Sequence, residues 1–162
     1  MDSSSKEVLK AIDPEPPRTP KSRKEPGHLD HWTPAILLER GAYLRKLARH
    51  SDGSASETLK EYPQHGTMLS FRSRDGQAEL HENFADIFYV LEGRATLVTG
   101  GTIAGAAAVG PGEVRGAAIE GGARQELRAG DVAHVPAGVP HQFLVRGEKT
   151  VTCFVVKIQE NL

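Results

Sequence analysis

The sequence has little that would point to a membrane, nucleic acid or a disulfide framework. Its single cysteine, Cys153, has no partner for an intrachain disulfide, and this fits a reducing compartment. Acidic and basic residues nearly cancel, which leaves a formal charge of −1 and no basic surface for nucleic acid or anionic lipid. No apolar run is long enough to span a bilayer, and the segment Met1–Lys6 lacks the basic-then-apolar pattern of a secretory signal. We therefore expect a cytoplasmic protein.

The 162 residues fit one folded domain with preceding segments of different character. Residues 1–31 are rich in proline and charge, so we expect a disordered tail. Residues 32–60 are predicted to be a helix and a linker packed on a barrel formed by residues 61–162. The helix begins at Thr33-Pro34, with threonine as N-cap and proline in the first turn. It is predicted over Pro34–His50, with an apolar stripe that must be buried against the body of the protein or a second subunit.

After Gly66 the sequence changes to short β-rich runs separated by turns. Many short strands without intervening helices predict an all-β, antiparallel sandwich or barrel. The Gly- and Ala-rich stretch 100–122 is interpreted as a long excursion with one arm at Glu113–Ile119. The predicted strands are Thr67–Arg72, Ala78–His81, Asp86–Leu91, Ala95–Thr99, Val132–Val135, Gln142–Val145 and Val151–Ile158.

One predicted hairpin, "GDVAHVPAGVPHQF" at 130–143, carries a histidine on each arm. These are His134 and His141. A histidine inside a barrel needs hydrogen-bond partners to offset its desolvation. A bound metal is the other common reason to place an imidazole there. The hairpin therefore marks a candidate site.

This hairpin resembles the second motif of the cupin superfamily, a group of small jelly-roll β-barrels. That motif has a Gly, five residues, Pro-x-Gly, two residues and a His. Gly130, Pro136, Gly138 and His141 match it position for position. The resemblance implies an antiparallel jelly-roll barrel with one N-terminal helix, and it implies that His141 faces the barrel interior.

The first cupin motif is His-x-His, three or four residues, Glu, six residues and Gly. In "LHENFADIFYVLEG", Asp86 and Gly93 match its carboxylate-to-glycine end. His81 can be the first histidine, in which case Asn83 takes the place of the second. Counting back from Asp86 instead puts the histidine positions on Leu80 and Glu82. The resemblance covers roughly residues 66–158, with a long connection between the two motifs.

The resemblance implies a divalent metal inside the barrel, bound by His81, Asp86 and His141. Iron, manganese, nickel and zinc all accept two imidazoles and a carboxylate. Asn83 or His134 is expected to complete the ligand set, and His134, on the paired arm, is the favoured acid–base residue lining the cavity. His65, ahead of the first predicted barrel strand, is the second candidate for that role.

The favoured function is that of an enzyme that oxygenates, isomerises or cleaves a small organic substrate at the metal. Two alternatives stay open: a metal-free acid–base cupin, such as a cyclase or isomerase, and a non-catalytic module that binds a small molecule. No helix-turn-helix is visible, and neither nucleic acid nor a membrane is expected as a partner. Exposed sheet edges and the helix stripe predict a homodimer.

Overall fold

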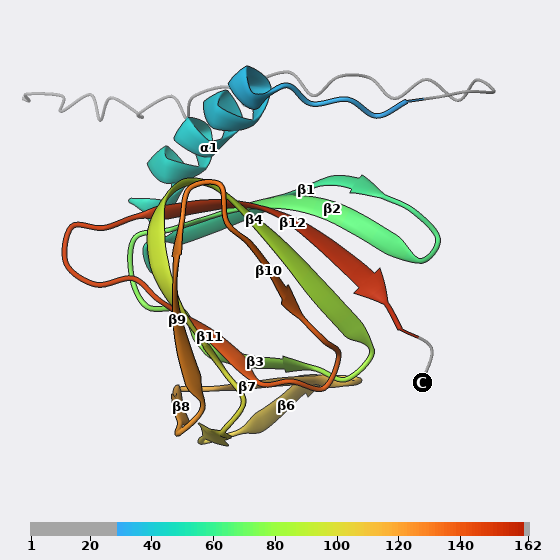
Figure 1. Ribbon diagram of the computed structural model, residues 1–162, viewed down its shortest axis with the longest axis vertical. Helices are drawn as coiled ribbons and strands as arrows, with labels where there is room; N and C mark the ends of the chain where they lie inside the picture. The colour runs from blue at the N-terminus through green and yellow to red at the C-terminus, as the bar shows by residue number, and fades with distance from the viewer. Residues whose placement is uncertain (1–28, 161–162) are drawn as a thin grey trace, which may run out of the picture.

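The computed structural model describes residues 29–160, which form one helix and a curled antiparallel sheet (Figure 1). The strand order is β1-β2-β12-β4-β11-β3-β7-β6, with β9 and β10 also paired to β4 and with β5 and β8 forming a separate pair. This is the antiparallel barrel with one N-terminal helix that the sequence predicts. The elements are α1 (Pro34–Ala48), β1 (Ser54–Glu61), β2 (His65–Arg72), β3 (Ala78–His81), β4 (Phe84–Thr99), β5 (Thr102–Ala104), β6 (Ala107–Gly110), β7 (Glu113–Gly116), β8 (Ala118–Glu120), β9 (Ala123–Arg128), β10 (Val132–Val135), β11 (His141–Leu144) and β12 (Val151–Gln159).

Strand β4 connects the two walls of the barrel. Its first half pairs with β10 and β12, and its second half pairs with β9 and β11. Gly93 lies between the halves with φ of 82°, and a Cβ there would lie 1.9 Å from the carbonyl oxygen of Thr150. Only glycine fits this backbone conformation and this contact. The sequence analysis predicts two strands here, but the structure has one continuous strand that bends at Gly93.

Successive side chains of β2 point to opposite faces of the sheet. Leu69 and Phe71 point outward and pack against Leu37 and Leu44 of α1. Met68, Ser70 and Arg72 point into the barrel, where they line its cavity. The barrel interior has its own apolar cluster, which includes Phe88, Val90, Leu97, Phe143 and Val155. The helix therefore covers the outer face of the sheet and leaves the inner face to the site (Figure 1).

Helix α1 begins as predicted, because the Thr33 side chain accepts a hydrogen bond from the amide of Ile36. It packs closely on β12, since a Cβ on Gly41 would lie 3.0 Å from Thr152 Cγ2. Arg40 of the helix is also buried, and it is ion-paired with Glu57 of β1. The stripe is thus covered by the chain's own sheet, so it no longer argues for a second subunit. Within residues 29–160, no helix has the length and apolar character to cross a membrane.

The strand predictions hold best where the sequence alternates or has clear turn residues at both ends. Strands β3 and β10 have the predicted bounds, and β2, β11 and β12 differ only at their ends. Strands β1 and β9 are not predicted. Their burial patterns contain one buried residue each, so they carry no strong period-two signal. Strand β1 lies within the predicted linker, so the sheet begins before residue 61, while residues 1–28 of the predicted tail lie outside the described residues.

Candidate metal centre

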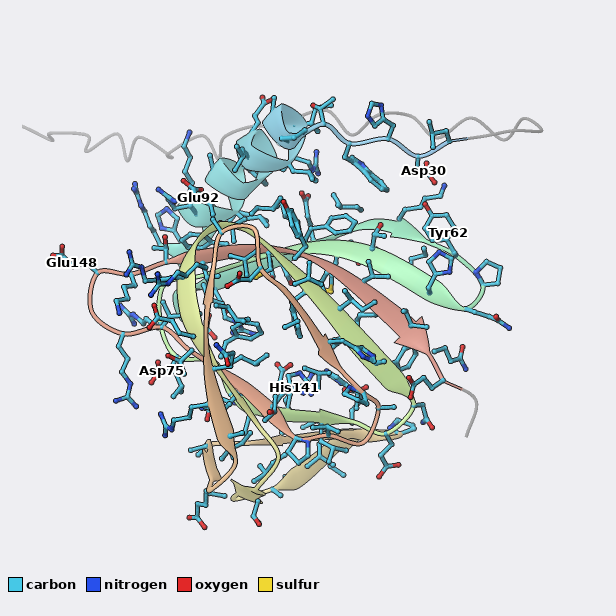
Figure 2. The ribbon with its side chains drawn as sticks, viewed as in Figure 1. Asp30, Tyr62, Asp75, Glu92, His141 and Glu148 are labelled. Atoms are coloured by element: carbon cyan, nitrogen blue, oxygen red, sulfur yellow. The ribbon has the colours of Figure 1, made fainter. Side chains whose placement is uncertain are left out.

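Four side chains converge on one point inside the barrel, beside the inward-pointing His141 ring (Figure 2). Glu79 and His81 are two residues apart on β3 and so share its inner face. Asp86 comes from β4, and His141 is the first residue of β11. Asp86 and both histidines are buried, and the Glu79 side chain is 23% exposed.

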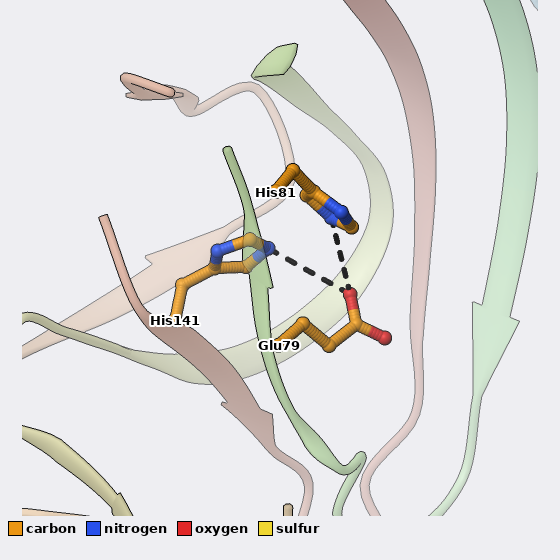
Figure 3. A group of neighbouring side chains, drawn as sticks. All are labelled: Glu79, His81 and His141. Carbon is orange, nitrogen blue, oxygen red and sulfur yellow. Dashed lines mark ion pairs between the residues drawn. The ribbon is translucent and has the colours of Figure 1, made fainter. Parts of the chain in front are cut away.

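The donor atoms of Glu79, His81 and His141 all lie within 4.8 Å of one another, close enough to bind one metal ion. Glu79 Oε2 lies 3.7 Å from Nε2 of both His81 and His141 (Figure 3). Asp86 Oδ2 lies 3.3 Å from His81 Nε2 and 3.5 Å from His141 Nε2. Two ligands at ~2.1 Å from a tetrahedral ion lie ~3.4 Å apart. Two imidazoles and the Glu79 carboxylate form a suitable donor set for a divalent metal, and Asp86 lies beside both imidazoles.

His141 shows the clearest sign of a missing partner. Its Nδ1 lies 3.2 Å from the carbonyl oxygen of Val139, which can only accept a hydrogen bond, so Nδ1 carries the proton. The lone pair of the neutral ring is then on Nε2. Across residues 29–160, this Nε2 is the one buried side-chain nitrogen or oxygen atom without a hydrogen-bond partner. A buried lone pair aimed at a second imidazole and two carboxylates is what a metal would satisfy.

His81 is oriented by a carboxylate behind it. Its Nδ1 donates to Glu113 Oε2 over 2.6 Å, which turns Nε2 toward the convergence point. Such outer carboxylates fix the orientation of metal-binding histidines and increase their basicity. Burial alone would lower the pKa of His81, but the neighbouring carboxylates of Asp86 and Glu79 outweigh burial and raise the pKa to about 9. Without a metal, His81 is therefore protonated at neutral pH.

The two carboxylates are ionised despite their burial. Burial by itself would raise the pKa of Glu79, but His81 and the charge of Arg115 lower it to about 2. Burial also acts to raise the pKa of Asp86, but the adjacent imidazoles of His141 and His81 and the ammonium of Lys157 hold it well below its usual range. Both groups are thus negative at any pH at which the protein is used.

Lys157, on β12, places a cation of the chain itself at the site. Its Nζ donates to Asp86 Oδ1 over 2.9 Å and lies 3.3 Å from His81 Nε2. This lysine follows Cys153 and Val155 on the inner face of β12. The sequence analysis does not identify it, although a charged residue at an inward position of a strand is unusual enough to be a signal.

The convergence point opens into a cavity of about 330 Å³, which we call the barrel cavity. Its single thiol, Cys153, is buried, and burial raises the pKa of that thiol to about 12, so Cys153 is a thiol rather than a thiolate near neutral pH. A second cavity of about 360 Å³ lies at the β1–β2 hairpin and shares Met68 and Lys157 with the barrel cavity. The barrel-cavity lining is Ser56, Met68, Ser70, Arg72, Glu79, His81, Asp86, Phe88, Arg115, Phe143, Val151, Cys153, Val155 and Lys157.

The structure brings His81, Asp86 and His141 together and separates the other predicted residues from them. Asn83 is exposed in the turn between β3 and β4, with its amide toward Gly112. His134 is exposed on β10; its neighbour Val135 is the buried residue there and pairs with Asp86. His65 is exposed at the start of β2, where it stacks on Tyr62 and lines the second cavity.

Glu79 is the ligand candidate that the sequence analysis misses. The first cupin motif allows four residues between the second histidine and the carboxylate. With that spacing, Glu79 and His81 occupy the two histidine positions, and Asp86 and Gly93 follow in register. A carboxylate thus stands in place of the first histidine. The sequence does indicate Glu79 as a ligand candidate, because Glu79 shares the inner face of its strand with His81.

The family comparison agrees with the fold and with this motif. A family model described as "Cupin domain" matches residues 112–157, which include the complete second motif and its His141. The part of the chain that carries the second motif thus matches a cupin domain, and the antiparallel barrel around it agrees with that fold. No curated protein matches the sequence.

Several solved structures are similar to this chain at low sequence identity. An uncharacterized conserved protein with a double-stranded β-helix domain from Klebsiella pneumoniae is 18% identical, with 68% of this chain and 82% of that chain covered and a TM-score of 0.50. TT1209 from Thermus thermophilus is 19% identical, with 73% and 95% covered and a TM-score of 0.49. The polyketide cyclase RemF from Streptomyces resistomycificus is 19% identical, with 65% of each chain covered and a TM-score of 0.48.

Proposed function

We propose that this cupin is a metal-dependent enzyme that oxygenates, isomerises or cleaves a small organic substrate in the barrel cavity. Glu79, His81, Asp86 and His141 would hold one iron, manganese, nickel or zinc ion. The observation that carries the proposal is the unpartnered, buried Nε2 of His141 amid these donors. A divalent metal at this position would supply a Lewis acid for a substrate oxygen.

The residues of the chain have separate roles around that ion. Glu113 holds the His81 ring through Nδ1, so its loss should loosen the site without removing a ligand. Lys157 is the nearest proton donor that is not itself a proposed ligand, and its Nζ reaches Asp86 and His81. The apolar residues Phe88 and Phe143 form the wall beside His141 and limit water around the substrate.

Metal analysis of purified protein tests the proposal, with reconstitution if the first preparation is metal-poor. We expect about one divalent ion per chain in the wild type, and loss of most of it in Glu79→Ala and His141→Ala. His134→Ala is the matched control, because it removes an exposed histidine from β10 and should keep the metal. A wild type that neither contains nor takes up metal would overturn the proposal.

A metal-free acid–base enzyme is the second candidate, and the position of Lys157 favours it. Its ammonium already neutralises Asp86 and contacts His81, so the site has a cation without a metal. The His81 ring resonances, followed by NMR during addition of Zn²⁺, separate the two candidates. The metal enzyme predicts a stoichiometric change in these resonances together with release of a proton. Unchanged resonances at excess Zn²⁺ would favour the acid–base enzyme.

A further inference from the structure

The walls of the barrel cavity carry more positive than negative charge. Arg72, Arg115 and Lys157 line it against the carboxylates of Glu79 and Asp86. All three cations are partly buried, with 26%, 27% and 31% of their side chains exposed. Their charges are therefore screened less by solvent than those of surface residues. Lys157 is engaged by Asp86, so Arg72 and Arg115 are the cations left to face an anionic ligand in the cavity.

Arg72 has hydrogen-bonding capacity to spare within the cavity. Its Nη2 lies 3.7 Å from Glu79 Oε1, which is beyond hydrogen-bond distance. Across residues 29–160, no carbonyl or carboxylate oxygen accepts a hydrogen bond from its guanidinium. Arg115 Nε is also 3.7 Å from the same Glu79 oxygen, while its Nη1 is held by Glu113 and the carbonyl of Val114. Two guanidinium groups thus flank one carboxylate oxygen without binding it tightly.

The guanidinium of Arg72 rests against a glycine. A Cβ on Gly76 would lie 2.8 Å from Arg72 Nη1 and 3.0 Å from Cζ. The φ of Gly76 is not positive, so its backbone does not require glycine. An alanine at this position would therefore fold but would push the end of the arginine side chain aside. The substitution Gly76→Ala therefore displaces the positive charge of Arg72 without removing it.

The rest of the cavity wall is apolar and its volume is modest. Met68, Phe88 and Phe143 contribute larger apolar surfaces, and Val151 and Val155 complete the β12 side. The volume of about 330 Å³ is near the lower end of the ~300–1,000 Å³ found for small-molecule pockets. The cavity therefore fits a small molecule with an apolar body and one charged end.

We infer that the substrate of this cupin is a small organic monocarboxylate whose carboxylate binds Arg72 and Arg115 and whose apolar body packs against Phe88 and Phe143. This inference rests on the proposed function, because it names the substrate class of the same cavity. Guanidinium groups bind carboxylates through paired, charge-assisted hydrogen bonds. A phosphate ester offers the same kind of oxygen acceptors, so phenyl phosphate is included in the test to distinguish the two anions.

Calorimetric titration with benzoate, benzamide and phenyl phosphate tests this inference, in metal-free and in Zn²⁺-treated protein. The three probes share one ring and differ in charge. We expect benzoate to bind at least about tenfold more tightly than benzamide, because charge-assisted hydrogen bonds are lost with the amide. Benzoate should also bind more tightly than phenyl phosphate. Arg72→Met and Gly76→Ala should each weaken benzoate by about tenfold or more, whereas Arg128→Met, at an exposed position, should not.

Metal content of the same samples distinguishes the two ways of failing. Arg72→Met and Gly76→Ala leave the four proposed ligands in place and should keep the wild-type metal content. If benzoate binds no better than benzamide, or binds equally well to Arg72→Met, the substrate class is wrong even where the metal is present. If benzoate binding depends on Arg72 in a protein that takes up no metal, the metal-dependent function fails and the carboxylate site stands.

Discussion

Replacing Lys157 by methionine should make this protein less stable without metal and better at binding metal. The Lys157 ammonium lies 2.9 Å from Asp86 and 3.3 Å from Nε2 of His81, the atom on which a metal would bind. A metal ion and the ammonium group therefore compete for the same two side chains. Methionine keeps most of the volume and removes the charge.

The magnitude follows from the burial of Asp86, which is 3% exposed. Removing one partner of a buried ion pair costs ~3–5 kcal/mol when the other charge is left alone. Asp86 keeps His81 and His141 at 3.3 and 3.5 Å, so we expect about 2 kcal/mol. For a domain of this size, that loss lowers Tm by roughly 4–8 °C.

Linkage between the two equilibria gives the expected effect on metal affinity. If the metal displaces the ammonium, the wild type loses the Lys157–Asp86 interaction on binding and the variant does not. The same ~2 kcal/mol then appears as metal binding about 30-fold tighter in Lys157→Met. Competition titration with a chromophoric chelator measures this ratio, and thermal unfolding in chelator measures the change in stability.

Lys149→Met, which changes an exposed lysine, is the matched control and should leave both quantities unchanged. A Lys157→Met protein with wild-type metal affinity would refute the competition. It would show that the ammonium and the metal occupy separate positions in the barrel cavity. Loss of metal binding in the same variant would instead show that Lys157 is needed to assemble the site.

Three further outcomes can be measured on the same protein. Metal affinity should rise about tenfold per pH unit from neutrality to about pH 9. The reason is that metal binding removes the proton from His81, which holds it up to a pKa of about 9. An affinity independent of pH over this range would exclude His81 as a ligand. The metal-free protein should lose stability between pH ~6.5, the ordinary histidine pKa, and about pH 9. The raised pKa of His81 stabilises the folded state only while His81 stays protonated. Urea unfolding at several pH values measures whether stability falls as the pH rises. Gly93→Ala should destabilise the fold by about 3 kcal/mol or more, because of its positive φ and the Thr150 carbonyl, and a loss below about 1 kcal/mol would contradict the described bend.

The sequence predicts the barrel because its strands are short and bounded by turn residues. Strand β3 is correct from Ala78 to His81, and the second motif is correctly placed around His141. Strands β1 and β9 are missed because one face of each is solvent-exposed and the other is only partly covered. The homodimer stays a prediction. It now depends on exposed sheet edges such as β6, where Val109 is 61% exposed, and light scattering at micromolar concentration tests it.

The site is less predictable than the fold, because it depends on contacts between distant segments. His81, Asp86 and His141 follow from motif spacing. Glu79 follows too, once the longer gap in the first motif is used. The contacts of Lys157 and Glu113 with His81 do not follow from spacing, since they connect residues that are 76 and 32 positions apart. Only the pairing of β7 with β3 brings Glu113 opposite His81.

The excursion at residues 100–122 has a consequence for anyone who would shorten this protein. It resembles a removable surface insertion, and joining Thr99 to Ala123 would keep all four proposed metal ligands. Yet β7 within it carries Glu113 and Arg115, and the buried Gln142 side chain ties the excursion to the barrel by accepting from the Ile119 amide. A variant shortened in this way would keep the four proposed ligands. It would lose Glu113, which orients His81, and Arg115, which lines the barrel cavity. The segment between the two motifs therefore supplies strands of the barrel sheet as well as residues that act on the site.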